Sequence, residues 1–344
     1  MKIDIINSNL TKNCQIQIND FLLKYGSATT FFQSPSYFMA CLQTTNKKPT
    51  YILLYSDDDK LIGVLLYVRQ NFIRLPLAKF MSSRDIIIGG PVVKEDNSLA
   101  LIRILDVYIK QRFLPIYSEF RNLFDQSKNK EIFAKKNIVF EEHLNILVDI
   151  SKDEESLRKS LKTNAKRNIQ KSIKEGCEFS EDTTISSLKD SYKILKEVYE
   201  RAKLPLPSLV YFENMLNCST RGNELKNFKV KYNNETIACM LCVVSNNMIY
   251  EYYTGAFQNY FDKYPNYLLT WEIFMWGKKH NINTFDFGGA GKPNIPYGVR
   301  EYKLKFGGEL INYGRFTRIN YPLAYKISVR SFNLLRRIIN KIYK

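Results

Sequence analysis

The sequence predicts an α/β (α+β) protein built from two copies of one unit, each with a mixed, mainly antiparallel sheet flanked by helices. The first observation is a polar turn followed by an apolar strand, which occurs twice. Residues 57–60 (DDDK) precede Leu61–Val68, and residues 233–236 (NNET) precede Ile237–Val244. Such a turn and strand are typical of a β-hairpin. The second observation is that helical segments come before the hairpin in each half.

The repeat extends upstream of both hairpins at nearly the same offset. Tyr37-Phe38 in the first half is echoed by Tyr211-Phe212 in the second. At 344 residues, of which 45% are hydrophobic and 25% charged, the chain is long and apolar enough for two globular domains. We expect a first domain at residues 1–150, a second at 151–319 and a basic C-terminal helix at 320–344.

The second half shows the periodicity of each expected element in chain order. Apolar residues recur four positions apart over residues 157–173, which predicts one helix that ends near Gly176. A second helix at 188–202 stops before Pro205. The remaining expected elements are strands at 228–232, 237–244 and 248–254, a helix at 266–279, a strand at 284–287 and a closing strand at 310–319.

The cysteines and the ends of the chain bear on the compartment and on metals. Cys239 and Cys242 lie inside an apolar run, which favours buried core over a metal site in a chain with two histidines. The first residues lack the apolar run of a signal peptide, and no stretch reaches the roughly 20 apolar residues of a membrane span. We expect a cytoplasmic protein. The acid-free helix at 320–344 either docks on the first domain or lies on an anionic membrane surface.

The net charge of +17 is concentrated in the second half. Residues 1–150 carry 19 Lys and Arg against 15 Asp and Glu, whereas residues 151–344 carry 32 against 19. Residues 158–174 alone hold seven basic residues and no acid. A polyanionic partner is therefore expected to meet the second half.

Four motifs occur in a fixed order in the second half. They are KRNIQKSIKEG from Lys166, YYTG at Tyr252–Gly255, DFGG at Asp286–Gly289 and YKLKFGG at Tyr302–Gly308. Together they resemble the FemABX peptidyltransferase group, over about Leu157–Phe316. The resemblance implies two tandem GNAT-like domains, here without the coiled-coil arm of some members. It also implies transfer of an aminoacyl group from aminoacyl-tRNA to an amine of a peptidoglycan precursor.

Lys303 matches the lysine that the family pattern places near the transferred acyl group. An amine that attacks an ester builds a negative tetrahedral oxygen, which a fixed cation in a water-poor site stabilises. The alternative for Lys303 is a surface lysine. Asp286 is expected to hold the acceptor amine or to receive its proton, and the alternative is a structural acid at a strand end.

Further residues are expected to bind substrate. Arg167 matches the substrate-binding arginine of the family, and Lys162 and Lys166 stand beside it, because a guanidinium fork suits phosphate oxygens. The alternative is a solvated helix face. From the first half come Arg84, before an apolar strand, and Gln33 in the FQSP segment that carries the weaker match there. Tyr253 and Tyr297 either orient the acceptor or pack as ordinary aromatic residues.

The donor and the acceptor are predicted from what the sequence lacks. No glycine occurs between Gly255 and Gly277, where enzymes that use acyl-CoA hold the pyrophosphate on a Gly-rich turn. This favours aminoacyl-tRNA or another carrier of the acyl group over CoA, and no cofactor is expected. The resemblance implies an envelope precursor as acceptor. Ala40-Cys41 replaces a lysine of many family members, so this acceptor is either a peptidoglycan precursor or an amino sugar of a surface polysaccharide.

Two other functions stay open at this level. One is a GNAT-type N-acyltransferase that uses acyl-CoA or acyl-carrier protein on an amino sugar of a surface polysaccharide. The other is a non-catalytic GNAT-like module that binds RNA or anionic membrane through the basic half.

Overall fold

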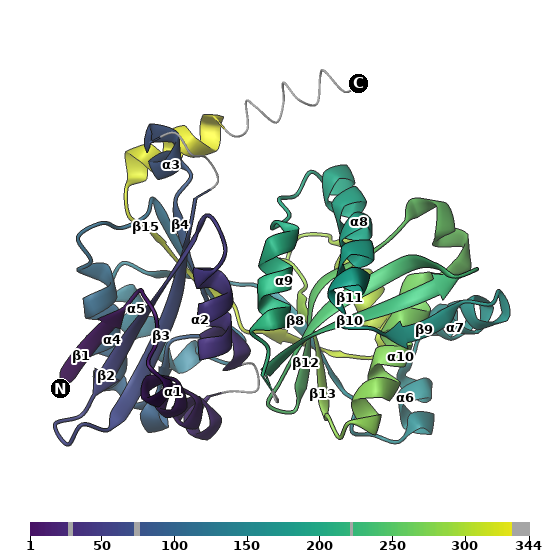
Figure 1. Ribbon diagram of the computed structural model, residues 1–344, viewed down its shortest axis with the longest axis horizontal. Helices are drawn as coiled ribbons and strands as arrows, with labels where there is room; N and C mark the ends of the chain where they lie inside the picture. The colour runs from purple at the N-terminus through teal and green to yellow at the C-terminus, as the bar shows by residue number, and fades with distance from the viewer. Residues whose placement is uncertain (27–29, 72–75, 221–222, 332–344) are drawn as a thin grey trace. The chain divides into compact units, whose positions relative to one another are not determined.

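The computed structural model describes residues 1–26, 30–71, 76–220 and 223–331, which fold as two compact units that interleave along the chain (Figure 1). The first unit comprises residues 1–26, 44–141 and 314–344, and the second comprises 27–43 and 142–313. Both are sheets flanked by helices, as the sequence predicts.

The first unit is built on a sheet in the order β1-β2-β3-β4-β6-β15-β7, with β5 paired to β3. Its strands are β1 (Lys2–Ile6), β2 (Lys47–Tyr55), β3 (Leu61–Gln70), β4 (Arg84–Ile88), β5 (Val92–Val93), β6 (Tyr117–Arg121), β7 (Val139–Glu141) and β15 (Arg315–Ile319). Its α-helices include α1 (Lys12–Tyr25), α3 (Pro76–Met81), α4 (Ser98–Ile109) and α5 (Lys130–Ala134). The core of this unit lies between α4 and the sheet, where Ile104, Leu105 and Tyr108 are buried.

The second unit is built on a sheet in the order β9-β10-β11-β12-β13-β8-β14. Its strands are β8 (Leu144–Asp149), β9 (Glu178–Glu181), β10 (Asn223–Tyr232), β11 (Glu235–Ser245), β12 (Met248–Ala256), β13 (Thr284–Gly289) and β14 (Glu309–Asn312). Its helices are α2 (Pro35–Leu42), α6 (Glu154–Ser160), α7 (Thr163–Lys174), α8 (Ile185–Ala202), α9 (Leu209–Asn217), α10 (Pro265–Lys279) and α11 (Gly298–Lys303), with short 3-10 turns η1 (Thr30–Gln33), η4 (Gln258–Lys263) and η5 (Leu304–Phe306).

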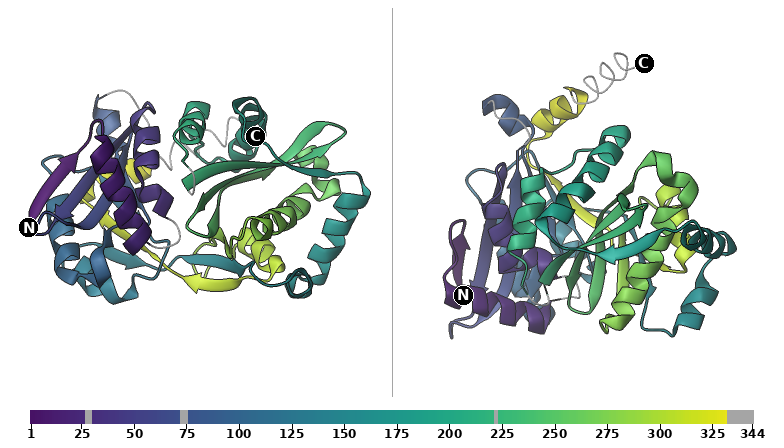
Figure 2. Two further views of the ribbon diagram at one scale, coloured as in Figure 1. Left: turned by 60° about the horizontal axis from the view of Figure 1, so that its bottom comes forward. Right: turned by 45° about the vertical axis from the view of Figure 1, so that its right-hand side comes forward.

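Helices cover both faces of the second sheet. α8 packs on β10, β11 and β12 from one side, and α10 packs on the same strands from the other (Figure 2). Side chains alternate accordingly along β11: Cys239 meets the α8 segment, whereas Met240 and Cys242 join the core under α10. Burial raises the pKa of the Cys239 thiol to about 12, so this thiol stays protonated at neutral pH. Both cysteines of the apolar run are core residues.

The two sheets have one topology. Read from β1 and from β9, seven strands correspond in order, and β4 pairs β6 in parallel just as β12 pairs β13. The two hairpins of the repeat are β2-β3 and β10-β11. The internal duplication that the sequence predicts is therefore present in the fold.

Each sheet contains one strand that directly follows a strand of the other sheet in the chain. β8 follows β7 in the chain yet pairs with β13 and β14, and β15 follows β14 yet pairs with β6 and β7. The single closing strand expected at 310–319 is therefore wrong, because the chain turns at Gly314 (φ 65°) and gives two strands to two sheets. The expected linear division at residues 150 and 319 differs from the compact units for the same reason.

The basic helix expected over 157–173 is broken into α6 and α7. Leu161 and Lys162 are extended, with ψ of 138° and 149°, and the Lys162 amide donates to the Lys305 carbonyl at 2.9 Å. The expectation of one helix is wrong because a tertiary hydrogen bond captures an amide that helix continuation would use.

The last described residues, 322–331, are helical. They contact the first unit, where the Ser328 hydroxyl donates to the Met81 carbonyl at 2.7 Å and the Tyr325 ring stacks on Tyr117 with centroids 5.7 Å apart. The rest of the helix expected at 320–344 lies outside the described residues from 332 onward. Among the helices that the structure describes, none has the length and apolar character needed to cross a membrane.

Candidate active site

The parallel strands β12 and β13 separate partway along their length. They pair from Met248–Thr284 to Tyr250–Asp286, after which β12 continues to Ala256 on its β11 side alone. β13 continues to Gly289, which pairs with Asn145 on β8. The strands thus open from Glu251 onward, and the DFGG and YKLKFGG motifs meet at this opening.

Lys303 reaches into this opening from the end of α11. Its side chain is 7% exposed, and Nζ donates to the carbonyl of Phe287 and, at 3.5 Å, to that of Gly289. Nζ also lies 3.3 Å from Oε1 of Glu251, whose side chain is 9% exposed. The alternative of a surface lysine is therefore wrong: Lys303 is a buried ammonium at the point where the strands diverge.

Asp286 fixes the turn that presents those carbonyls. It is fully buried, accepts the Gly288 amide at 2.7 Å, and faces the Asn145 amide nitrogen at 3.3 Å from both oxygens. Gly288 has φ 65°, a conformation that glycine adopts without strain. Burial raises the pKa of Asp286 to about 6, against the opposing effects of these hydrogen bonds and of Lys303.

Two carboxyl groups and one ammonium therefore share this buried cluster. Burial also raises the pKa of Glu251, although the Lys303 charge acts in the opposite direction. Sequence reasoning missed both Glu251 and Asn145. The available signal for Glu251 was an acid inside the apolar and aromatic strand IYEYYTG, where a charge without a partner would be costly.

Aromatic side chains line the opening on the α8 side. The Tyr253 ring lies 5.4 Å from that of Tyr199 and 5.0 Å from that of Phe212. Burial raises the pKa of Tyr199, and Tyr253, Glu251 and Tyr297 add to the rise, so these groups are electrostatic neighbours. Tyr297 precedes α11 and is 41% exposed. The structure thus places Tyr253 beside Tyr199 and Phe212, and Tyr297 in the loop before α11, next to Gly291.

Arg300 holds the loop that carries Tyr297. Its guanidinium is 8% exposed and donates to the carbonyls of Ala290, Lys292 and Ile295 at 3.3, 2.8 and 2.7 Å. These bonds connect the end of β13 to the start of α11. Sequence reasoning also missed this arginine, because its partners are backbone atoms that carry no sequence signal.

The predicted anion-binding residues lie on the outer side of α7. Arg167 and Lys162 are exposed and Lys166 is half-buried, and none of the three makes an ion pair with a described residue. The Lys162 amide is bonded to the Lys305 carbonyl, two residues beyond Lys303. This hydrogen bond connects the start of α7 to the segment that carries Lys303.

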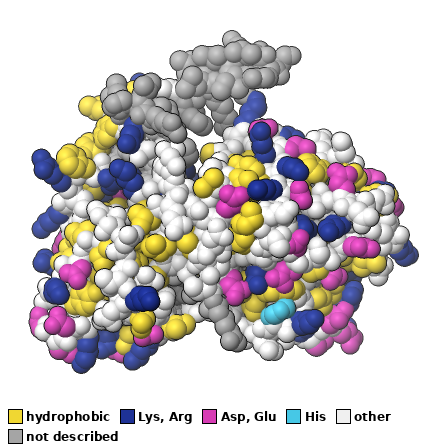
Figure 3. All heavy atoms as spheres, in the orientation of Figure 1, with side chains coloured by type: hydrophobic (Ala, Val, Ile, Leu, Met, Phe, Trp, Pro, Cys, Tyr) yellow, Lys and Arg dark blue, Asp and Glu magenta, His cyan; other side chains and the backbone are white. Residues whose placement is uncertain are grey.

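On the face of the molecule drawn in Figure 3, basic and acidic side chains are interspersed.

The remaining two predicted residues belong to other elements, η1 and β4. Gln33 is fully buried in η1, within the second unit. Arg84 belongs to β4 of the first unit, where its guanidinium faces the Gln70 side-chain oxygen at 3.3 Å.

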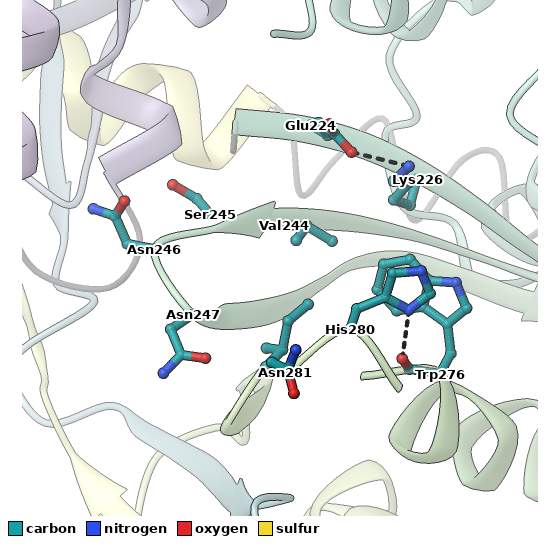
Figure 4. Close-up of a pocket in the computed structure, with 10 residues that line it drawn as sticks. Glu224, Lys226, Val244, Ser245, Asn246, Asn247, Trp276, His280 and Asn281 are labelled. Atoms are coloured by element: carbon teal, nitrogen blue, oxygen red, sulfur yellow. Dashed lines mark hydrogen bonds and ion pairs between the residues drawn. The ribbon is translucent and has the colours of Figure 1, made fainter. Parts of the chain in front are cut away.

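A pocket of about 360 Å³ lies at the other end of the strands, near the β11-β12 turn (Figure 4). His280 stacks on Trp276 at 4.0 Å on one side, and the Glu224–Lys226 ion pair of 2.9 Å lies on the other. None of the predicted site residues lines it. Within the described residues no group of His, Cys, Asp and Glu is arranged to hold a metal ion.

Comparisons with known proteins agree with this geometry. Residues 217–330, which include β12, β13 and α11, match the model of the FemAB family. The crystal structure of FemX superposes with a TM-score of 0.71 at 16% identity, covering 95% of this chain and 100% of that one. A comparison with curated proteins finds no significant match.

Other solved structures share the fold over most of their length. L-PGS from Bacillus licheniformis has a TM-score of 0.56 at 14% identity, covering 91% of this chain and 95% of that one. A tandem GNAT protein from the clavulanic acid biosynthesis pathway has a TM-score of 0.55 at 9% identity, covering 92% and 98%. The resemblance to the FemABX peptidyltransferase group is therefore confirmed, and the protein is an acyltransferase with two GNAT-like units in tandem.

Proposed function

We propose that the protein transfers an aminoacyl group from aminoacyl-tRNA to an amine of a peptidoglycan precursor, in the cytoplasm. The observation that carries the proposal is the buried Lys303 ammonium in the opening between β12 and β13. The FemAB match over that segment and the FemX fold support this chemistry over the other acyltransferase functions.

The reaction is aminolysis of an ester. The acceptor nitrogen forms a bond to the acyl carbon, the carbonyl oxygen becomes an oxyanion, and the tRNA hydroxyl leaves as the ester bond breaks. An ammonium fixed in a water-poor site stabilises that oxyanion without reorganising during the reaction. Lys303 has this environment, because two carbonyls and Glu251 hold it and its side chain is 7% exposed.

Two features support a polyanionic donor. α7 presents Arg167, Lys162 and Lys166 outward without ion pairs to described residues, and such groups suit the phosphates of an RNA end. The turn before α10 lacks a phosphate cradle: Pro265 at the first helical position has no amide hydrogen, and the Tyr267 amide already donates to Tyr264. Both features disfavour acyl-CoA.

The test is a donor and acceptor comparison with the full chain. We expect labelled amino acid to pass from charged tRNA to a soluble peptidoglycan precursor, and acetyl-CoA to give no product with that precursor or with an amino sugar. Transfer from acetyl-CoA in the absence of charged tRNA would contradict the proposal that aminoacyl-tRNA is the donor. Transfer to the amino sugar alone would move the acceptor away from peptidoglycan.

We also propose that the C-terminal helix brings the enzyme to the inner face of the membrane. In its described part, Leu323 and Ile327 are 78% and 56% exposed beside the basic Lys326. Exposed apolar and basic side chains on one helix suit an anionic bilayer. Cosedimentation with anionic vesicles, lost in a Leu323→Gln/Ile327→Gln variant, is the expected result, and equal binding by both proteins would contradict it.

A further inference from the structure

The buried cluster contains two carboxyl groups. Asp286 is fully buried and accepts the Gly288 amide, whereas Glu251, which holds Lys303, stands at the opening between the strands. Glu251 is the first residue of β12 beyond the last pair with β13, so it stands where the strands open. Its side chain is 9% exposed, and Oε1 lies 3.3 Å from Lys303 Nζ. In the proposed reaction the acceptor amine enters this opening, where Glu251 stands beside the cation that serves the acyl oxygen.

Titratable groups approach Glu251 from four neighbouring elements. They are Lys303 and Tyr302 from α11, Asp286 from β13, Cys242 from β11 and Tyr199 from α8. Among these groups Lys303 is the one cation, and it already donates to the Phe287 and Gly289 carbonyls. Burial raises the pKa of Glu251, which makes this carboxylate a stronger proton acceptor than one in water.

We propose that Glu251 is the general base of the transfer: it takes a proton from the acceptor ammonium and, once neutral, releases Lys303 from their ion pair to face the acyl oxygen. The inference rests on the proposed function, because it requires an amine acceptor that arrives protonated. It adds a coupling to that function, since activation of the nucleophile and exposure of the stabilising cation become one event.

The protons and bonds balance in this scheme. One proton of the acceptor ammonium moves to Glu251 and leaves a lone pair on nitrogen. That nitrogen bonds to the acyl carbon, and the carbonyl electron pair moves to oxygen, where the Lys303 ammonium faces it. When the carbonyl reforms, the ester C–O bond breaks and the leaving oxygen takes a second proton from nitrogen. The third proton stays on the amide, and Glu251 returns its proton to solvent.

The ion pair explains why the order of events matters. While Glu251 is ionised, its charge holds Lys303 at 3.3 Å and partly neutralises it. A neutral carboxyl loses most of that attraction, whereas the two carbonyl acceptors stay in place. Lys303 then presents its full charge to the oxyanion at the moment the nucleophile becomes competent.

The test compares two acceptors in wild type and Glu251→Gln. With the alkylamine acceptor of the precursor, which is protonated at pH 7, Glu251→Gln should slow transfer about 100-fold or more. With hydroxylamine, which is largely neutral at pH 7 and needs no base, the variant should transfer at least as fast as wild type, because glutamine, like a neutral carboxyl, leaves the Lys303 charge unpaired. The rate of the variant with the alkylamine should also rise tenfold per pH unit, because deprotonation by solvent replaces Glu251.

Equal slowing with both acceptors would overturn the proposal, because it would mean that Glu251 only positions Lys303. Glu251→Asp keeps a carboxylate and should recover part of the alkylamine rate, whereas no recovery in a folded variant also counts against a base. The unfolding midpoint of each variant shows whether it is folded.

Failure of the proposed function is a separate result. If wild type transfers nothing from aminoacyl-tRNA but uses another acyl donor, the donor proposal fails and the same two-acceptor comparison still tests Glu251. A second measurement needs no turnover. The infrared band of the protonated Glu251 carboxyl, identified by its absence in Glu251→Gln, should persist to a higher pH than the band of an ordinary glutamate. A band that titrates like an exposed glutamate would overturn the proposal.

Discussion

At the scale of single residues, Lys303 is held by partners from two strands. Glu251 comes from β12, and the Phe287 and Gly289 carbonyls come from β13. Lys303 was predicted as a candidate because YKLKFGG resembles the family pattern that places a lysine near the transferred acyl group. Its burial and its ion pair follow from pairings between distant segments. The neighbours of Asn145 in the chain gave no signal for its role, and those of Glu251 marked it only as an acid inside an apolar and aromatic strand.

The raised pKa of Asp286 makes a prediction about stability. Its ordinary value is 3.8 and its value in the folded protein is about 6, so the folded state binds the proton more tightly than the unfolded state. The contribution is fully present below pH 3.8 and is lost as pH rises through 6, which lowers stability by about 3 kcal/mol over this window.

Urea unfolding at pH 4 and pH 7 measures this effect. Asp286→Asn removes the titration, so the variant should gain about 2 kcal/mol relative to wild type between the two pH values. Asp149, an exposed acid on neighbouring β8, provides the matched control, and Asp149→Asn should show no such gain. If the free energy of unfolding of Asp286→Asn differed from that of wild type by the same amount at both pH values, this would contradict a raised pKa of the buried Asp286 carboxyl.

At the scale of elements, the sequence predicts those helices and strands that local patterns determine, and it misses the features that depend on tertiary contacts. The hairpins β2-β3 and β10-β11 follow from turn residues between apolar strands, so the sequence predicts them well. The break between α6 and α7 does not follow from any local pattern, because the Lys305 carbonyl captures the Lys162 amide across the fold. That break sets where α7, and with it Arg167, begins relative to the Lys303 segment.

The basic surface of α7 predicts salt-dependent binding of the donor. Replacing Lys162, Lys166 and Arg167 with Gln should weaken tRNA binding, and the slope of log affinity against log salt should fall by about 0.7 to 0.9 for each phosphate that the variant no longer neutralises. Filter binding across a salt series is the measurement. The matched control is Lys193→Gln/Lys196→Gln on α8, whose lysines already pair with Asp190 and Glu200.

In the case of α7, an unchanged slope in the triple variant would place the RNA elsewhere on the protein. A steeper loss of affinity in the α8 control would do the same. Either result would leave the Lys303 chemistry intact, because binding of the donor body and stabilisation of the oxyanion reside on different elements.

At the scale of the whole molecule, the exchange of β8 and β15 joins the two units. Sequence repetition predicts two copies, but it does not say which copy receives the last strand of each, since strand pairing is non-local. A linear cut at residue 150 therefore removes β8 from the middle of the second sheet, between β13 and β14.

This exchange makes a prediction about fragments. A fragment of residues 151–319 should lack cooperative urea unfolding, because β13 and β14 lose their shared neighbour. A fragment that begins at residue 142 restores β8 and should unfold with a sharper transition, although it still lacks α2. Equal cooperativity in the two fragments would show that β8 is dispensable for the second unit.

The most direct test of the central claim is the single-turnover rate of acyl transfer in Lys303→Met. We expect a loss of about 100-fold or more relative to wild type, because the oxyanion loses its fixed cation. Lys279→Met, an exposed lysine on α10, should keep the wild-type rate. Removal of Lys303 leaves Glu251 buried without its cation, which can destabilise the fold. The double variant Lys303→Met/Glu251→Gln removes that unpaired charge, so a loss of activity in this variant reports lost chemistry rather than lost folding. A folded Lys303→Met enzyme within threefold of wild type would contradict the account.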